Sequence, residues 1–172
     1  MQARVTACQS LLLTSQKKEF LADLVTGEES WVLNNNDTQR AVWIPRGEEP
    51  PVQPKANLHK KKCLLSCFWD AKGMLYYELL PQGITVNATI ELKWDTVLHP
   101  PYLPDIAPSA YHLFRPLKLF LKQKRFVKYE DFKMAVFDFF DSQSAAFWKK
   151  GIDDLPERWL IVVTNDGQYI VD

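Results

Sequence analysis

The sequence predicts an α/β protein in which a mixed sheet, beginning as an antiparallel meander, is followed by a C-terminal helical layer. Two observations indicate this class. Turn signals separate short runs rich in Val, Leu, Trp and Tyr between residues 25 and 80, as in a meander. Beyond a proline-rich stretch, aromatic and aliphatic residues recur at helical spacing. We expect one domain, with a lead-in helix in residues 1–24, the sheet in 25–98, and the proline-rich turn and helical layer in 99–172.

The first predicted element is a short helix over residues 16–24. Thr14 or Ser15 can cap its start, because a hydroxyl oxygen accepts hydrogen bonds from the first backbone N–H groups of a helix. Phe20 and Leu24 lie on one side of this helix, which would face the core.

The sheet is predicted from short apolar runs joined by turn residues. The expected strands are residues 25–33, 39–44, 63–69, 74–80 and 96–98. Asparagines and an aspartate at 34–37 indicate a hairpin turn, and Asp70 to Gly73 forms the next turn. The prolines and glutamates of residues 45–55 favour an exposed loop.

Four prolines within nine residues define the segment that follows, namely Pro100, Pro101, Pro104 and Pro108. They exclude regular helix and central strand, because each proline lacks an N–H and fixes its φ. A helix begins near Ser109, and Pro116 either kinks it or occupies its first position.

Three more helices are expected downstream, over residues 131–141, 144–150 and 156–165, with an apolar tail at 169–171 that docks on the domain. The first is apolar almost all round, so it should be covered on more than one side. Gly151 is expected to cap the second. Trp148 and Trp159 are interpreted as core residues in preference to base-stacking residues.

The cysteines do not form a recognised metal motif. Cys63 and Cys67 lie on one face of a strand, but a structural zinc site needs about four ligands. His59 and Cys8 are not at a spacing that completes such a site, so we favour buried small hydrophobic residues over zinc ligands. Three cysteines indicate a reducing compartment, and the short apolar centre of the N-terminus is below what a signal peptide or membrane span requires. We expect an intracellular chain, nuclear or cytoplasmic, with no membrane partner.

Acidic and basic residues balance at 21 each, so no net positive field draws the whole molecule to nucleic acid. Any DNA contact must come from a local patch. Arg115, Lys118, Lys122 and Arg125 line one helix face, and no acid interrupts the stretch from 115 to 128. A solvated outer face of an amphipathic helix is the simpler interpretation of this pattern.

Long motifs give the sequence a family resemblance. HPPYLPDIAPSAYHLF at residues 99–114 resembles the late block of mariner-type transposases, usually HPPYSPDLAPSDYHLF, and departs from it at Leu103, Ile106 and Ala110. The other matching stretches are LVTGEESWV at 24–32, WDAKGMLYYELLPQGITVNA at 69–88 and LPERWLIVVTNDGQYIVD at 155–172. The chain is identified as a mariner-type transposase catalytic domain. His99 and His112 belong to the block without being its metal ligands, so both are interpreted as structural.

The resemblance implies a ribonuclease-H-like fold and DNA cut-and-paste chemistry in which three aspartates hold two Mg²⁺ or Mn²⁺ ions. Here the set is broken: Glu28 replaces the first aspartate, Ala110 replaces the third, and the HDN block that carries the second is absent. We therefore expect one central strand and its flanking helices to be deleted. No cofactor is expected, and Glu28 is at most a single ligand.

Three functions follow from the resemblance. The first is a catalytically inactive remnant that retains weak, nonspecific DNA binding. The second is a residual metal-dependent endonuclease in which Asp105 or Asp95 assists Glu28. The third is a protein-interaction module, in which the proline-rich turn and aromatic layer bind a partner or form a homodimer. Sequence-specific recognition is not expected, because the segment before residue 24 is too short for the family's helix-turn-helix modules.

The deletion leads to one prediction about the sheet. The link at residues 83–94 is barely long enough for a crossover of about a dozen residues. We expect the strand at 96–98 to move beside residues 25–33, because a gap there would leave backbone groups unpaired.

Overall fold

The computed structural model describes residues 2–15, 19–33, 62–81, 103–122, 124–126 and 128–170. Several predictions lie outside these residues, namely the strands at 39–44 and 96–98, the loop at 45–55, the pairing of 96–98 with 25–33, and the placement of His59, Asp95 and His99.

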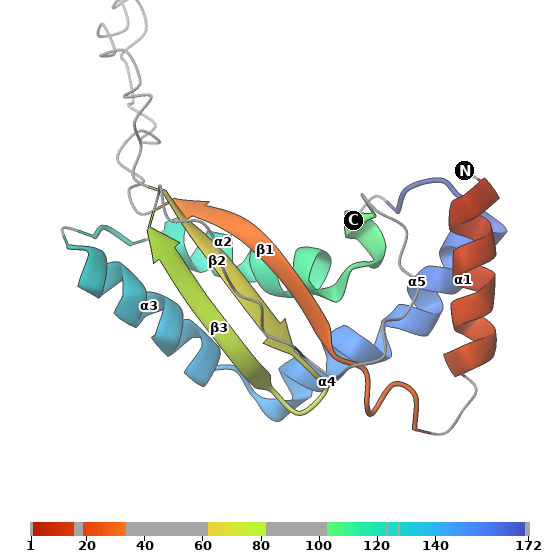
Figure 1. The fold of residues 1–172 in the computed structure, drawn as a ribbon, viewed down its shortest axis with the longest axis horizontal. Helices are drawn as coiled ribbons and strands as arrows, with labels where there is room; N and C mark the ends of the chain where they lie inside the picture. Colours follow the sequence, from red (N-terminus) through yellow and green to blue (C-terminus); the bar gives the residue numbers. More distant parts are fainter. Residues whose placement is uncertain are drawn as a thin grey trace, which may run out of the picture.

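A three-stranded antiparallel sheet forms one layer of the described fold (Figure 1). Its strands are β1 (Thr26–Leu33), β2 (Lys62–Trp69) and β3 (Met74–Pro81), in the order β1-β2-β3. The predictions for these strands are confirmed to within a residue. Glu28 lies opposite Cys67, which in turn lies opposite Tyr77.

The turn between β2 and β3 is held by Asp70. Its carboxylate accepts hydrogen bonds from the backbone N–H groups of Lys72 at 2.7 Å and Gly73 at 2.9 Å. Its own N–H donates to the Gly73 carbonyl at 3.0 Å. An aspartate that bonds the backbone two residues ahead stabilises such a turn, as the sequence predicted.

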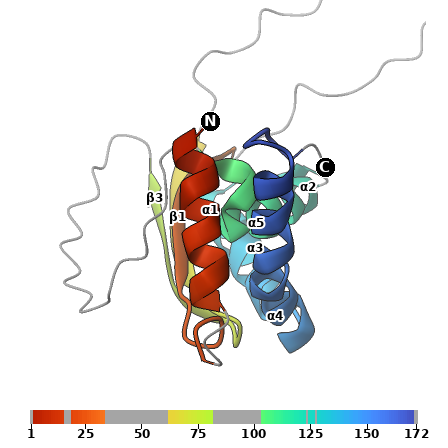
Figure 2. The ribbon, with the colours of Figure 1, turned by 90° about the vertical axis from the view of Figure 1, so that its right-hand side faces the viewer.

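The helical layer lies along one face of the sheet, as the side view in Figure 2 shows. Its elements are the short 3₁₀-helix η1 (Pro104–Ile106), the π-helical segment η2 (Ser109–Phe114), α2 (Arg115–Lys122), α3 (Tyr129–Asp141), α4 (Ala145–Asp153) and α5 (Leu155–Thr164). The three predicted C-terminal helices are confirmed, with ends that differ by a few residues. Among the described helices none is long and apolar enough to cross a membrane.

The predicted helix over residues 16–24 is wrong. The helix is α1 (Gln2–Ser15), it packs against α5, and residues 19–23 form a turn (Figure 2). The Thr14 hydroxyl donates to the Ser10 carbonyl at 2.9 Å, and the Ser15 hydroxyl donates to the Leu12 carbonyl at 2.8 Å. Both hydroxyls therefore bond back into the helix that ends there, and neither caps a helix that starts after them.

Pro116 does not interrupt the helical run from η2 into α2. The turn before it is π-helical, and the α-helical hydrogen-bonding pattern begins at Arg115. Pro116 thus falls in the first turn of α2, where a backbone N–H has no α-helical partner to lose. Of the two alternatives, the placement near a helix start describes the structure better.

Gly151 does not cap α4, contrary to the prediction; it lies buried inside the helix. A Cβ atom at this position would come within 2.6 Å of both the His112 ring and the Trp69 ring. The glycine therefore serves close packing of α4 against η2 and the end of β2. Ser144 begins α4, and its hydroxyl accepts a hydrogen bond from the Phe147 N–H at 3.2 Å.

The core forms between the helix-facing side of the sheet and the helical layer. Trp69 lies at its centre: the indole N–H donates to the Ser109 hydroxyl at 3.0 Å, and the Trp148 ring is 5.5 Å away. Trp148 and Trp159 are both buried, which confirms them as core residues. The expectation for α3 is wrong in part, because Met134 and Phe137 are 57% and 48% exposed.

Candidate functional site

Glu28, the only residue that retains a carboxylate at a position of the expected triad, lies on the helix-facing side of β1. It is half-buried, and its Oε2 atom is shielded from solvent without a hydrogen-bond partner among the described residues. Burial raises the pKa of the Glu28 carboxyl, while the positive charge of Lys118 acts to lower it. A partly buried carboxylate of this kind needs a cation nearby to stay ionised.

Cys67, directly opposite Glu28 in the sheet, does not supply a reactive group. Its Sγ donates to the Glu28 carbonyl oxygen at 3.7 Å. Burial raises the pKa of Cys67 to about 12, with the Glu28 charge adding to the rise. The thiol therefore stays protonated at neutral pH and is not a nucleophile. The three cysteines are free and buried, which confirms the burial expected for Cys63 and Cys67.

Ala110 lies in η2, and η2 packs against β1. The structure thus brings the segment that carries Ala110 against the strand that carries Glu28. The two positions belong to neighbouring elements, as a shared metal site would require. A methyl group cannot coordinate a cation, so the second of these two positions contributes no ligand.

Asp105 is committed to other partners and is not available as the substitute ligand that the sequence suggested. It is 8% exposed and forms a bidentate ion pair with Arg4, with Nη1 to Oδ1 at 2.9 Å. Its Oδ2 also accepts a hydrogen bond from the Ile170 N–H at 2.9 Å. Burial alone would raise the pKa of Asp105, but the bonds from Arg4 and Ile170 and the charge of Arg4 outweigh burial and lower it. The Ile170 bond also confirms that the tail docks on the domain.

His112 is structural, as expected. Its Nε2 donates to the Phe147 carbonyl at 2.8 Å, and the two rings lie 4.3 Å apart. Burial lowers the pKa of His112, so the ring is neutral near pH 7.

The described residues do not fit the two-metal site that the resemblance implies. No group of three His, Cys, Asp or Glu side chains in the described part of the chain can hold a metal ion. Glu28 stands alone, Ala110 is a methyl group, and Asp105 is held by Arg4. Two-metal chemistry needs several converging carboxylates, which this surface does not supply.

The four basic residues of the expected DNA stripe do not behave alike. All four are exposed, but Lys118 reaches across to β1, where its Nζ donates to the Ser30 hydroxyl at 2.8 Å. Arg115, Lys122 and Arg125 make no hydrogen bond or ion pair to other described residues. Arg115, Lys122 and Arg125 are therefore available to bind a phosphate group, whereas Lys118 points toward Glu28 on β1.

Two contacts of the site were missed in the sequence. Arg4 and Asp105 are 101 residues apart, and Lys118 and Ser30 are 88 apart, so no local pattern could reveal either pair. Arg4 is the only charged residue of α1, and this was the available signal for the first pair. The second pair had no signal.

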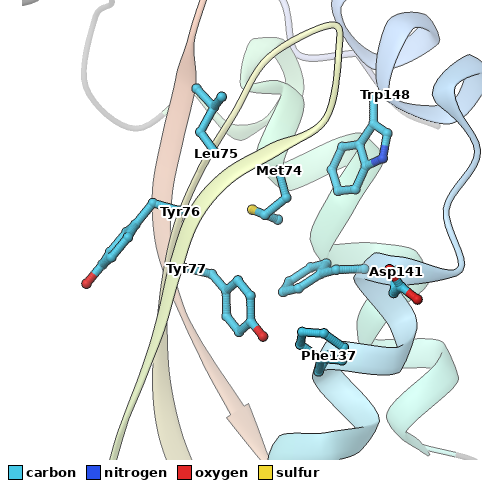
Figure 3. A pocket seen from close by; sticks show the side chains of 8 residues that line it. Met74, Leu75, Tyr76, Tyr77, Phe137, Asp141 and Trp148 are labelled. Carbon is cyan, nitrogen blue, oxygen red and sulfur yellow. The ribbon is translucent and has the colours of Figure 1, made fainter.

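A separate pocket of about 420 Å³ lies between β3 and helices α3 and α4. Figure 3 shows Met74, Tyr77 and Trp148 directed into it, whereas Tyr76 points away. The remaining lining residues are Leu75, Phe137, Phe140 and Asp141. β2 separates this pocket from Glu28, and its apolar lining with one carboxylate suggests no catalytic chemistry.

The family described as Transposase (partial DDE domain) matches residues 33–90. The Mariner Mos1 transposase of Drosophila mauritiana is 30% identical to this chain in an alignment of 216 residues. The alignment covers 99% of this chain and 63% of that protein. The human Histone-lysine N-methyltransferase SETMAR is 30% identical in an alignment of 211 residues. The alignment covers 96% of this chain and 31% of that protein.

The crystal structure of the catalytic domain of Mos1 mariner transposase is 28% identical, with a TM-score of 0.77, and the match covers 98% of this chain and 94% of that one. This neighbour confirms the expected ribonuclease-H-like α/β fold. The chain spans less than two thirds of the length of either curated relative.

Proposed function

Because the chain belongs to the mariner-type transposases and has the fold of their catalytic domain, we propose that it is a catalytic domain of this family without metal-dependent DNA cleavage. The observation that carries the proposal is Ala110. It lies on the segment packed against the strand of Glu28, where the resemblance implies a carboxylate. Each metal in a two-metal mechanism needs several oxygen ligands, and a methyl group supplies none.

The loss of an internal segment supports the same proposal. The sequence has no HDN block, so the second carboxylate has no position on which to lie. The region aligned with the Mos1 transposase spans 216 residues, more than the 172 residues of this chain. A deleted central strand with its flanking helices accounts for such a difference.

The competing hypothesis of a residual endonuclease has less support. It requires Glu28 to share a metal with a substitute such as Asp105. That carboxylate is buried in an ion pair with Arg4, and releasing it would leave a buried arginine unpaired. A misplacement of about 1 Å already costs roughly 100-fold in rate, so a ligand that must first leave its partner is a poor candidate.

The activity that we propose to remain is weak, sequence-independent DNA binding through Arg115, Lys122 and Arg125. Their exposure and the absence of acids in the stretch from 115 to 128 support it. Lys118 is less suited to this role because its ammonium group is already bound to Ser30. Electrostatic contacts of this kind give affinity without sequence preference.

The test is a nicking assay on supercoiled plasmid with Mg²⁺ and with Mn²⁺. We expect no metal-dependent nicking by the purified chain, because the carboxylate set is incomplete. The matched control is Glu28→Ala, which removes the remaining carboxylate and should behave identically. Cleavage that the parent chain performs and Glu28→Ala does not would contradict the proposal.

Homodimer formation also remains a proposal. The proline-rich turn is a poor surface for it, because Leu103 and Ile106 are buried. The exposed Phe137 beside the pocket at β3 is the better candidate surface, and gel filtration of the chain reports its oligomeric state.

A further inference from the structure

The negative charge of the Glu28 carboxylate needs a compensating positive charge. Its carboxylate is half-buried on the helix-facing side of β1, and one oxygen has no hydrogen-bond partner among the described residues. Removing a carboxylate from water is costly unless an opposite charge compensates it. Divalent metal ions would serve that purpose in an intact two-metal site, but the ligands of such a site are missing among the described residues.

Lys118 is held where it can supply that charge. The Lys118 Nζ atom donates to the Ser30 hydroxyl at 2.8 Å. The same Nζ atom lies 5.7 Å from the centroid of the Phe114 ring. Ser30 is two residues from Glu28 on the same strand, so the two side chains point to the same face of the sheet. The hydroxyl and the ring therefore anchor the ammonium group on the Glu28 side of β1.

Among the described residues, Lys118 is the cation whose charge acts on the Glu28 carboxyl. Arg4, another buried cation, is already paired with Asp105 and is not available to Glu28.

We propose that the Lys118 ammonium group is the built-in counter-cation of Glu28 and takes the electrostatic place of the divalent ions that the family resemblance implies. A tethered cation both compensates the carboxylate and repels a metal ion that approaches it. Glu28 and Lys118 form no direct ion pair, so this compensation acts through space across the face of β1 that Glu28 and Ser30 share. This inference goes beyond the proposed function, because it concerns how the remaining charge is balanced and depends on neither cleavage nor DNA binding.

The experiment is a double-mutant cycle on the unfolding equilibrium in urea. The variants are Lys118→Met, Glu28→Gln and the combination, since methionine keeps the aliphatic stem and glutamine keeps the shape. We expect a coupling of about 2- to 5-fold in the unfolding equilibrium constant, the range of partly exposed charge pairs. Ser30→Ala should reduce this coupling, because Lys118 then loses its anchor.

Lys122→Met is the matched control, since Lys122 is an exposed lysine one turn further along α2. Its cycle with Glu28→Gln should show no coupling. A Lys118 coupling no larger than that of Lys122 would overturn the proposal, even if the nicking assay shows no cleavage. If Lys118→Met does not fold, the same cycle with Lys118→Gln decides the question.

Discussion

At the scale of single residues, Asp105 shows how a motif residue can be structural. The carboxylate binds Arg4 of α1, and it accepts the Ile170 N–H of the tail. The Asp105 carbonyl in turn accepts a hydrogen bond from the Arg158 guanidinium of α5 at 2.8 Å. One residue of the proline-rich block therefore connects both ends of the chain to the core.

We predict that Asp105→Asn lowers the free energy of unfolding at pH 7 by about 3–5 kcal/mol, because it leaves the buried Arg4 without its counter-charge. The pKa of Asp105 is lower in the folded state than in the unfolded state, so ionisation stabilises the fold. This contribution is fully present above the unfolded pKa of about 3.9 and is lost as pH falls through the folded pKa.

Urea unfolding from pH 7 downward therefore measures the effect. The difference between the parent chain and Asp105→Asn should shrink below about pH 4. Asp138→Asn, at an exposed position of α3, is the control and should change stability little at any pH. A penalty for Asp105→Asn that stays constant at low pH would show that packing, and not the ion pair, is responsible.

At the scale of elements, the sequence predicts strands better than it predicts contacts between elements. β2 and β3 were recognised because turn residues bound them and the local pattern decides their type. The first helix was misplaced because Thr14 and Ser15 fit the end of one helix as well as the start of another. Gly151 was misinterpreted because a glycine that caps a helix and one that admits a neighbouring ring look alike in sequence.

The same difference between local patterns and contacts between elements applies to the candidate site. The resemblance implies that Glu28 and Ala110 occupy positions of a broken triad, and the structure brings the elements that carry them into contact. It could not show that Asp105 is held by Arg4 or that Lys118 bonds Ser30, since both contacts depend on tertiary packing. The basic stripe is exposed, but the prediction that its four residues line one helix face is wrong for Arg125, which lies beyond the end of α2. The spacing also did not reveal that Lys118 points to the sheet.

The exposed basic residues of α2 and of the segment that follows it yield the element-scale prediction. Replacing Arg115, Lys122 and Arg125 by glutamine should weaken DNA binding equally for all sequences. The slope of log K against log salt should flatten by up to ~0.9 for each phosphate that the variant no longer neutralises. Fluorescence anisotropy with a labelled duplex across a salt series measures both quantities.

The control for this measurement is Lys118→Met. It should leave the slope unchanged, because Lys118 is bound to Ser30 and not available to phosphate. A slope that stays the same in the triple variant would show that the stripe is only a solvated surface.

At the scale of the whole molecule, the described core does not depend on the carboxylates that the family resemblance implies. The core is built from the helix-facing side of the sheet, the proline-rich turn and the helical layer, and Trp69 joins all three. None of these contacts involves a metal ligand. The described core is therefore held together by side-chain packing, which does not depend on a bound metal ion.

We propose above that Glu28 holds no divalent metal ion. Electron paramagnetic resonance of free Mn²⁺ tests this most directly, because the signal of the free ion falls as the protein binds it. Titrating Mn²⁺ into the parent chain and into Glu28→Gln should give the same curve, since no described group of carboxylates holds a cation. Bound Mn²⁺ in the parent chain that disappears in Glu28→Gln would contradict the account.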